Sequence, residues 1–260
     1  MKTSTVENLA PWVATLLLLA LWQLGVMAFH IENFVLPTPI EAIEQIYVNR
    51  NALALHGLAT LGTTLAGFAI AVVIGLLLGI LVGSFRLAYV SLYPILVGFN
   101  SVPKAAIVPV LVIWFGAGTI PAVLAAFLLS FFPVVVNVAT GFATIEPELL
   151  DVLRALGAKR RDMIVKIGIP RSLPYFFASL KIAITLAFVG SVIAEIVAGN
   201  NGIGNVMLIA SSNFNVPLVF AALLVVGVMG VSMYAIFAVL ETRFTSWSVR
   251  GRGLEYATGG

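Results

Sequence analysis

Long stretches without Asp, Glu, Lys or Arg make up most of this chain and are separated by shorter charged segments. A helix that crosses the hydrocarbon core of a bilayer needs about 20 mostly apolar residues, so the longer stretches predict membrane spans. They cover residues 8–31, 51–85, 87–103, 105–145, 182–194 and 196–240. The pattern predicts an all-α fold, a polytopic membrane helix bundle with six spans near residues 10–30, 58–83, 91–114, 121–143, 173–198 and 216–240.

Two of these stretches contain helix-breaking residues. The interval 105–145 is too long for one span, and the glycines within 116–119 predict a turn between two helices. Pro94, Pro103 and Pro109 crowd the third span, so we expect it to be kinked and partly buried in protein. The first span is expected to be a membrane anchor, because its apolar stretch is too long for a secretory signal and no small-residue cleavage motif follows it.

Two further local patterns concern packing and the region after the first span. Gly75, Gly79 and Gly83 recur at every fourth residue of the second span, which predicts close packing against another helix. Between the first two spans, the segment 31–56 contains an amphipathic stretch from Ile40 to Val48. We expect this stretch to form an interfacial helix that could also touch an external partner.

Composition places the chain in a bilayer. Of its 260 residues, 61% are hydrophobic. Only 25 residues, or 10%, are charged, whereas about a quarter of the residues in an average soluble domain are charged. The absence of cysteine excludes disulfides, thiolate nucleophiles and thiolate metal sites. His30 and His56 cannot form a zinc site by themselves, and we assign them no chemistry. In a soluble domain the net charge of +3 would suggest binding to nucleic acid. In a membrane protein, the positions of the basic residues instead indicate the orientation in the bilayer.

Eleven of the fourteen basic residues fall on one side of the predicted topology. They are Lys2, Arg86, Arg154, Lys159, Arg160, Arg161, Lys166, Arg171, Arg243, Arg250 and Arg252. Arg50 falls on the other side, and Lys104 and Lys181 lie within or near spans. By the positive-inside rule, both termini are expected to be cytoplasmic.

The segment 146–171 holds 10 of the 25 charges and is not an ordinary linker. Pro147 suits the first turn of a helix, and Leu149, Val152, Leu153 and Leu156 recur at helical spacing. Gly157 is suited to ending that helix with a positive φ. A second amphipathic segment contains Met163, Ile164 and Ile167, and Pro170 is expected to close it. The pattern predicts two short helices that meet at a sharp bend and protrude from the membrane, although a solvated loop that lies along the bilayer would share its composition.

The spacing within this loop resembles the coupling loop of ABC-importer permeases. That family's pattern is Glu-Ala-Ala, three residues, Gly, nine residues and Ile-x-Leu-Pro. Here Asp151-Val152-Leu153 is followed by three residues, Gly157, nine residues and Ile167-Gly168-Ile169-Pro170. The Gly and the Ile-x-x-Pro keep their register, whereas the Glu-Ala-Ala is replaced.

Six further features extend the resemblance over nearly the whole chain and are similar to the nitrate, sulfonate and taurine branch of that family. In order they are Leu36-Pro37-Thr38-Pro39; Pro103 and Pro109 before Trp114-Phe115-Gly116; Leu173-Pro174; Ala194-Glu195; Gly202-Ile203-Gly204; and Glu241 with Trp247. The resemblance implies a single permease domain over residues 1–260, with the coupling loop at 146–171, in a bacterial inner membrane.

The resemblance also implies partners. Such permeases work as a pair of membrane subunits, here expected to be a homodimer, with two cytoplasmic ATP-binding subunits and an extracytoplasmic substrate-binding protein. The chain has no Gly-x-x-x-x-Gly-Lys-Ser/Thr motif, so we expect no enzyme activity and no cofactor of its own, with ATP and Mg on the partner ATPase. The residues expected to dock on the ATPase are Leu149, Asp151, Leu153, Arg154, Leu156, Gly157, Lys159 and Arg160.

Few polar residues in the spans are candidates for a translocation pathway. An ionisable group in a span usually faces a partner or a water-filled path, and Glu195 is the clearest case. Counting along the helix places it near the outer surface, so an interfacial carboxylate or a structural ion pair stays the stronger alternative. Lys104 could attract an anion at mid-membrane, or could lie near an interface if the helix breaks at Pro103. Asn137 could line a path or bond a neighbouring helix, and Lys181 is expected to be structural.

Two other classes of function remain possible. An intramembrane enzyme would need a nucleophile and a base, but the chain has no His-Glu-x-x-His, no Gly-x-Ser-x-Gly and no aspartate in a span. An ion-coupled secondary transporter would normally show inverted repeats and several polar groups at mid-depth. For the substrate, the resemblance and Lys104 favour a small anion such as nitrate, a sulfonate or taurine, with bicarbonate or a pyrimidine or vitamin precursor as the alternative.

Overall fold

The structure is a computed structural model that describes residues 3–245, with the side chains of residues 3–8, Pro147, Leu150, Arg154 and Arg160 outside the described part. Within those residues every regular element is helical. The elements are α1 (Thr3–Ala28), α2 (Pro39–Val48), α3 (Arg50–Ser84), α4 (Arg86–Ser101), the 3₁₀ turn η1 (Lys104–Ile107), α5 (Val108–Phe115), α6 (Thr119–Ala143), α7 (Pro147–Ala155), α8 (Arg160–Met163), the π-helical turn η2 (Ile164–Gly168), α9 (Ile169–Ala198), α10 (Ile203–Ser212) and α11 (Val216–Phe244). Lys2, Trp247, Arg250 and Arg252 lie outside the described residues.

Five helices are long and apolar enough to cross a membrane, and a bent pair of helices supplies a sixth possible span. The all-α membrane bundle predicted from the sequence is therefore confirmed. The third predicted span, 91–114, is not one kinked helix: α4 and the η1–α5 segment meet at 79°. Pro103 precedes η1 and disfavours helical geometry in the residue before it, which explains the break.

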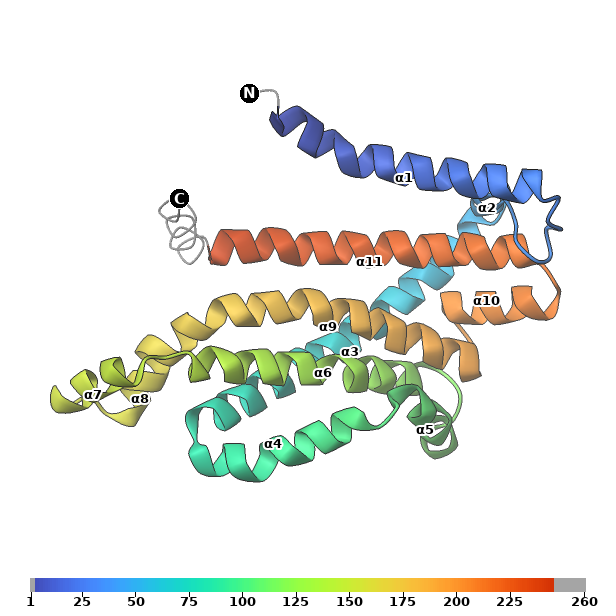
Figure 1. Cartoon of the computed structure of the whole chain (residues 1–260). Coiled ribbons are helices and arrows are strands. Elements are labelled where there is room, and N and C mark those ends of the chain that lie inside the picture. The colour runs from blue at the N-terminus through green and yellow to red at the C-terminus, as the bar shows by residue number, and fades with distance from the viewer. Residues whose placement is uncertain (1–2, 246–260) are drawn as a thin grey trace.

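The second span is longer than predicted. The helix α3 begins at Arg50 and not near residue 58, and its 35 residues are about 50 Å long at about 1.5 Å each. Because a bilayer core is only about 30 Å thick, such a helix must tilt or project beyond it. Figure 1 shows α3 running obliquely behind α6 and α9.

The core of the bundle is formed where α3, α6 and α9 pack together, with α11 against α9. Its buried apolar side chains come from all three helices and include Phe68, Val134, Val138, Leu180, Ile184 and Phe188. By contrast, α4 contains no buried residue, so it lies against the core only loosely. Among the five single-helix spans, α1 and α11 bury the smallest share of their residues, as expected for helices that face lipid.

The predicted glycine ridge lies against α6. A Cβ at Gly75 would come within 2.7 Å of the Val134 Cβ, and one at Gly79 within 2.6 Å of the Val138 Cβ. Real Cβ atoms do not approach this closely, so only glycine allows α3 and α6 to pack at this distance. The expectation of close helix packing is confirmed.

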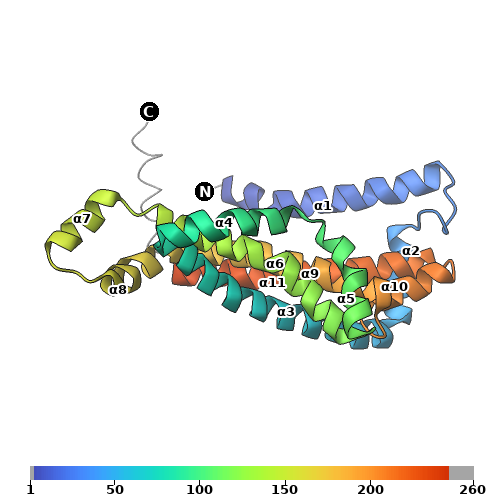
Figure 2. The same ribbon diagram turned by 90° about the horizontal axis from the view of Figure 1, so that it is seen from below.

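The bundle has two ends of different character. The end that carries α7 and α8, here called the loop end, also holds the beginning of α1 and the end of α11 (Figures 1 and 2). The opposite end, here called the α10 end, carries α2, α5 and α10. The helix predicted over Ile40–Val48 is α2, and it begins with a capping box in which Thr38 and Glu41 bond each other's backbone amides.

Candidate functional site

The first candidate site is the charged loop, in which α7 ends in a sharp reversal. The amide of Ala158 donates to the carbonyl of Leu153 at 3.0 Å, and Gly157 between them has φ +79°. A hydrogen bond to the carbonyl five residues earlier, with the intervening glycine in the left-handed backbone conformation, defines the Schellman motif at a helix C-terminus. The sequence prediction that Gly157 ends the first helix with positive φ is confirmed.

The second helix of the loop does not end at Pro170, so that expectation is wrong. From α8 the chain continues through η2 into α9, and together they form one uninterrupted helical segment. In η2 the amide of Ile169 donates to the carbonyl of Ile164, five residues back. This wider turn accommodates Pro170, which has no amide hydrogen and whose ring would clash with the preceding turn of a regular α-helix.

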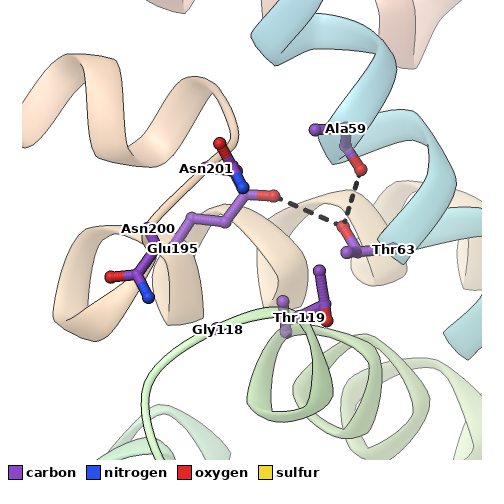
Figure 3. A pocket seen from close by; sticks show the side chains of 8 residues that line it. Ala59, Thr63, Gly118, Thr119, Glu195, Asn200 and Asn201 are labelled. Carbon is purple, nitrogen blue, oxygen red and sulfur yellow. Dashed lines mark hydrogen bonds between the residues drawn. The ribbon is translucent and has the colours of Figure 1, made fainter.

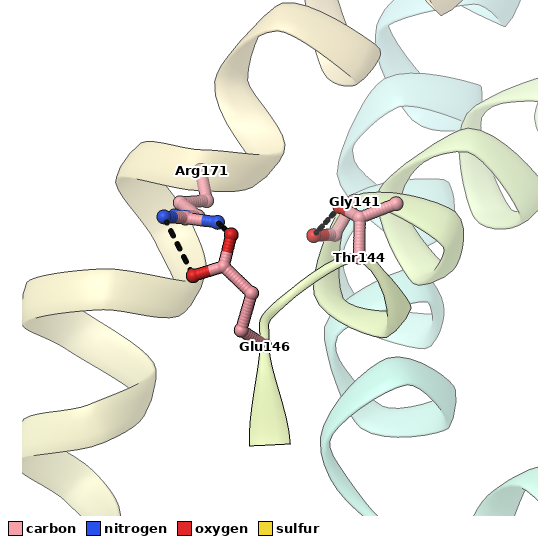
Figure 4. Close-up of polar contacts among 4 residues, drawn as sticks. All are labelled: Gly141, Thr144, Glu146 and Arg171. Carbon is pink, nitrogen blue, oxygen red and sulfur yellow. Dashed lines mark hydrogen bonds and ion pairs between the residues drawn. The ribbon is translucent and has the colours of Figure 1, made fainter. Parts of the chain in front are cut away.

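The base of the loop is bridged by an ion pair. The Arg171 guanidinium donates to the two carboxylate oxygens of Glu146 at 3.2 and 3.4 Å (Figure 4). These residues stand at the points where the loop leaves α6 and enters α9. Both side chains are substantially exposed, so the pair contributes little to stability but holds the two ends of the loop together.

The loop residues expected to dock on an ATPase are mostly accessible. Leu156 is 78% exposed, while Leu149 and Leu153 are half-buried. Asp151 and Lys159 are exposed, and the side chains of Arg154 and Arg160 lie outside the described part. A concave surface of about 220 Å³ lies between α7 and α8 and is lined partly by Leu153, Leu156 and Ile167. The protruding loop thus presents apolar side chains beside charged ones.

The second candidate site surrounds Glu195, near the α10 end of α9. This side chain is only 3% exposed. Its Oε2 accepts from the Thr60 hydroxyl at 2.9 Å and from the Gly204 amide at 3.0 Å. Its Oε1 lies 3.3 Å from the hydroxyls of both Thr63 and Ser191, which also bond each other. All four partners can donate, so the site suits an acceptor-only carboxylate.

The same cluster caps the beginning of α10. The first amides of a helix have no partner within it. Here three successive amides are bonded by side chains from other helices: Gly202 by His56 Nδ1 at 3.1 Å, Ile203 by Thr60 Oγ1 at 2.8 Å, and Gly204 by Glu195. A carboxylate at a helix N-terminus is also favoured by the helix dipole. Glu195 therefore joins α3, α9 and α10.

The glycines around Glu195 are required by its position. Gly202 has φ +99°, and a Cβ there would overlap the carboxyl group of Glu195. A Cβ at Gly204 would lie 2.6 Å from the Glu195 Cβ. The Gly202-Ile203-Gly204 motif thus allows the start of α10 to lie directly on the carboxylate.

A narrow recess opens beside this carboxylate (Figure 3). It is lined by Glu195 and Thr63, by Asn200 and Asn201 after α9, and by the turn that leads into α6. Its volume of about 20 Å³ is enough for about a single water molecule. The recess lies at the α10 end, and the side chains of Thr63, Asn200 and Asn201 border it beside the carboxylate.

The three candidate pathway residues do not form one cluster. Lys104 lies at the break between α4 and α5, where its ammonium donates to the Asn100 backbone oxygen at 2.9 Å and side-chain oxygen at 2.6 Å. Asn137 on α6 donates to the Pro133 carbonyl within its own helix at 2.8 Å. Glu195 has no basic partner among the described residues, so it is not part of a structural ion pair.

The sequence analysis missed the polar partners of Glu195. His56, Thr60 and Thr63 recur at spacings of four and three on α3, and Ser191 precedes Glu195 by one helical turn. These spacings place each set on one helix face, which was the available signal. Lys181 was expected to be structural, and it forms an ion pair with Glu241 that joins α9 to α11.

The fold is shared with a known class of membrane protein. A chain of the inward-facing MetNI methionine ABC transporter superposes with a TM-score of 0.63 at 18% identity, covering 72% of this chain and 93% of that one. The bundle of spans therefore has the same fold as a chain of an ABC transporter.

The sequence comparison identifies the family. Residues 71–246 match the family described as binding-protein-dependent transport system inner membrane component, and the chain belongs to that family. It is therefore a multi-pass inner-membrane permease, as the resemblance of the coupling loop implied. Membership of this family implies ATP-binding and substrate-binding partners.

Several relatives have names that specify solutes. The chain is 32% identical to the riboflavin transport system permease protein RibX of Chloroflexus aurantiacus, covering 90% of this chain and 88% of the relative. It is 28% identical to the formylaminopyrimidine transport permease protein ThiX of Halalkalibacterium halodurans, covering 93% and 96%. It is also 28% identical to SsuC of Bacillus subtilis, named for aliphatic sulfonates, covering 91% and 88%.

Proposed function

We propose that two copies of this chain form the translocation path of an ATP-driven importer, with two ATP-binding subunits at the loop end and a substrate-binding protein at the α10 end. In this proposal the loop end is cytoplasmic, because most of the basic residues lie there. The chain itself hydrolyses no ATP, since its sequence contains no phosphate-binding loop. Residues 1–260 act as a single permease domain.

The protruding loop carries this proposal. Leu149, Leu153 and Leu156 supply apolar contact to the ATPase, and a polar rim surrounds them. That rim consists of Asp151, Arg154, Lys159 and Arg160. Burial of an exposed leucine contributes about 1.5–3 kcal/mol, so burial of Leu156 against the ATPase would favour docking. Gly157 sets the direction in which α7 is presented.

Substitution of Gly157 tests this docking. No atom lies within 4 Å of a Cβ built at Gly157, so a side chain there meets no steric obstacle and acts only through φ. Gly157→Val should displace α7 and reduce co-purification of the ATPase about tenfold, because a β-branched residue resists positive φ. Gly157→Asn is the matched control, since asparagine tolerates this conformation. Normal ATPase recovery with both variants would contradict the proposed docking role.

The pathway residues remain part of the same proposal. Lys104 is the cation nearest the break in the third span, where a passing solute could meet it. Glu195 borders the recess at the α10 end, and Asn137 lies on α6 between the two ends of that helix. If the Lys104→Met variant transports the solute with an unchanged KM, Lys104 does not contact the solute on its path.

For the solute, we propose a small molecule delivered by the binding protein. An anion such as nitrate, a sulfonate or taurine is supported by the resemblance to the nitrate, sulfonate and taurine branch and by the relative named for aliphatic sulfonates. The relatives named for riboflavin and formylaminopyrimidine support the alternative, a heterocyclic vitamin or its precursor. A thermal-shift screen of the cognate binding protein with both sets distinguishes them. Uptake that persists without any ATPase would instead indicate a secondary transporter.

A further inference from the structure

A second concave surface lies at the loop end, away from Glu195 and from the docking residues. It is a groove of about 430 Å³ between the end of α3, the beginning of α4 and the last turns of α6. The groove lies where α4 packs loosely, and its walls include the small residues Gly83 and Ala139. Its volume lies within the range of pockets that hold small organic ligands.

Three polar groups of this groove can donate hydrogen bonds. The guanidinium of Arg86 and the hydroxyls of Tyr89 and Tyr93 have no hydrogen-bond or ion-pair partner within residues 3–245. The Thr140 hydroxyl donates to the Val136 carbonyl at 2.8 Å, so only its lone pairs remain available. No acidic residue lines the groove among the residues described. Unpartnered donors beside a fixed positive charge favour a ligand that carries an anionic group.

The aromatic groups add a second requirement. The rings of Tyr89 and Tyr93 are stacked, with centroids 4.9 Å apart and planes inclined by 15°. They lie one helical turn apart on α4 and form an aromatic wall beside Arg86. Offset stacking of a ligand ring on such a wall is favourable, and Arg86 can in turn lie over that ring. The remaining walls are apolar.

We propose that this groove binds solutes that combine an aromatic ring with an anionic group, as a subsite at the inner end of the translocation path. The inference rests on the proposed function for its position on the path, but the binding chemistry follows from the groove itself. A phospholipid headgroup is the competing ligand. Lipid sites usually gather several basic residues, whereas Arg86 is the one cation among the described residues that line this groove.

Binding of three simple probes tests the proposal. The protein is the permease with its ATPase, in phosphatidylcholine nanodiscs and without the binding protein, and binding is measured by saturation-transfer NMR. Benzenesulfonate carries both features, ethanesulfonate has the charge without the ring, and benzyl alcohol has the ring without the charge. We expect benzenesulfonate to bind at least about tenfold more tightly than either control, since each missing feature removes one favourable interaction.

Variants then assign the features to residues. Arg86→Gln should weaken benzenesulfonate binding about tenfold, with a smaller loss for Arg86→Lys, which keeps the charge but not the planar donor pair. Tyr93→Leu should weaken it about threefold to tenfold, and Tyr93→Phe, which keeps the ring, should restore binding to within about threefold. Equal binding of ethanesulfonate and benzenesulfonate, or equal binding by Arg86→Gln and the unmodified protein, would overturn the proposal.

Two further arms separate the explanations. The first arm uses nanodiscs that contain phosphatidylglycerol. If the groove is a lipid site, benzenesulfonate binding is lost there, and the unmodified protein retains more phosphatidylglycerol than Arg86→Gln does. This result would overturn the proposal. ATP-driven uptake with no benzenesulfonate binding would overturn the inference while leaving the proposed function intact. If no ATPase assembles with the chain, the proposed function fails, and the permease alone in the same nanodiscs still tests the groove.

Discussion

Replacement of Glu195 tests whether this carboxylate holds the α10 end together. In Glu195→Ala the neighbouring hydroxyls have other acceptors: Thr60 lies 3.1 Å from the His56 carbonyl, and Thr63 lies 3.0 Å from the Thr60 carbonyl. The Gly204 amide has no such alternative, because it belongs to the first turn of α10. Removal of the carboxylate therefore leaves one buried backbone donor without a partner.

The magnitude follows from these contacts. An orphaned buried donor costs about 1–3 kcal/mol, and loss of a helix cap costs about 0.5–2 kcal/mol. Because the two terms partly describe the same bond, we expect Glu195→Ala to lower the free energy of unfolding by about 1–4 kcal/mol. Glu195→Gln keeps one acceptor oxygen for Gly204, and its amide can donate to the hydroxyls of Ser191 and Thr63. We expect a loss of about 1 kcal/mol for this variant.

The assay is unfolding by SDS titration in mixed micelles, combined with hydrogen exchange at the amides of residues 202–204. Exchange at these amides should accelerate strongly in Glu195→Ala and only slightly in Glu195→Gln. Glu32→Ala removes an exposed carboxylate between α1 and α2, and it serves as the control, with an expected change within about 0.5 kcal/mol. Equal destabilisation by the Ala and Gln variants, or unchanged exchange at residues 202–204, would refute the capping role.

Three other predictions concern the packing of the bundle. Gly79→Ala should destabilise the protein by about 1–3 kcal/mol, because its Cβ would lie 2.6 Å from the Val138 Cβ. Gly62→Ala in the same helix, where nothing lies within 4 Å, should be neutral or stabilise by up to about 1 kcal/mol, and SDS titration compares the two. Lys181→Met and Glu241→Gln should show a coupling of about 1–3 kcal/mol in a double-mutant cycle, and a coupling near zero would mean that the ion pair does not join α9 to α11. Thr38→Ala removes one half of the capping box of α2 and should cost about 1 kcal/mol in the same titration, whereas Thr38→Ser should cost nearly nothing.

The location of the spans was predictable because the bilayer imposes a simple rule on the sequence. A charged residue in the hydrocarbon core is costly, so the charge-free intervals mark the helices that cross it. The helix bounds were less predictable. The charge-free stretch 51–85 nearly matches α3, but a stretch longer than a bilayer core does not show where a span begins within it, so the predicted span left out the first turns from Arg50. The continuation of α8 into α9 was missed because the π-helical turn η2 accommodates Pro170, and no local pattern indicates such a turn.

The two candidate sites differ in how far the sequence could predict them. The charged loop is a local structure: its bend depends on the φ of Gly157 and on a hydrogen bond between residues five apart, so spacing alone could predict it. The environment of Glu195 is not local. Its carboxylate bonds Thr60, which is 135 residues away in the sequence. The sequence placed Glu195 near the outer end of a span but could not indicate which side chains would surround it.

The sequence by itself thus determined the class of protein, the spans, the bend at Gly157 and the glycine face of α3, because each depends on burial in lipid or on the conformation of a few consecutive residues. Only the tertiary structure decided that α4 and α5 meet at 79°, that His56, Thr60 and Glu195 cap α10, and that Arg86 and two tyrosines border one groove. These features depend on how distant helices pack, and in a chain that is apolar almost throughout, hydrophobic pattern alone does not specify that packing.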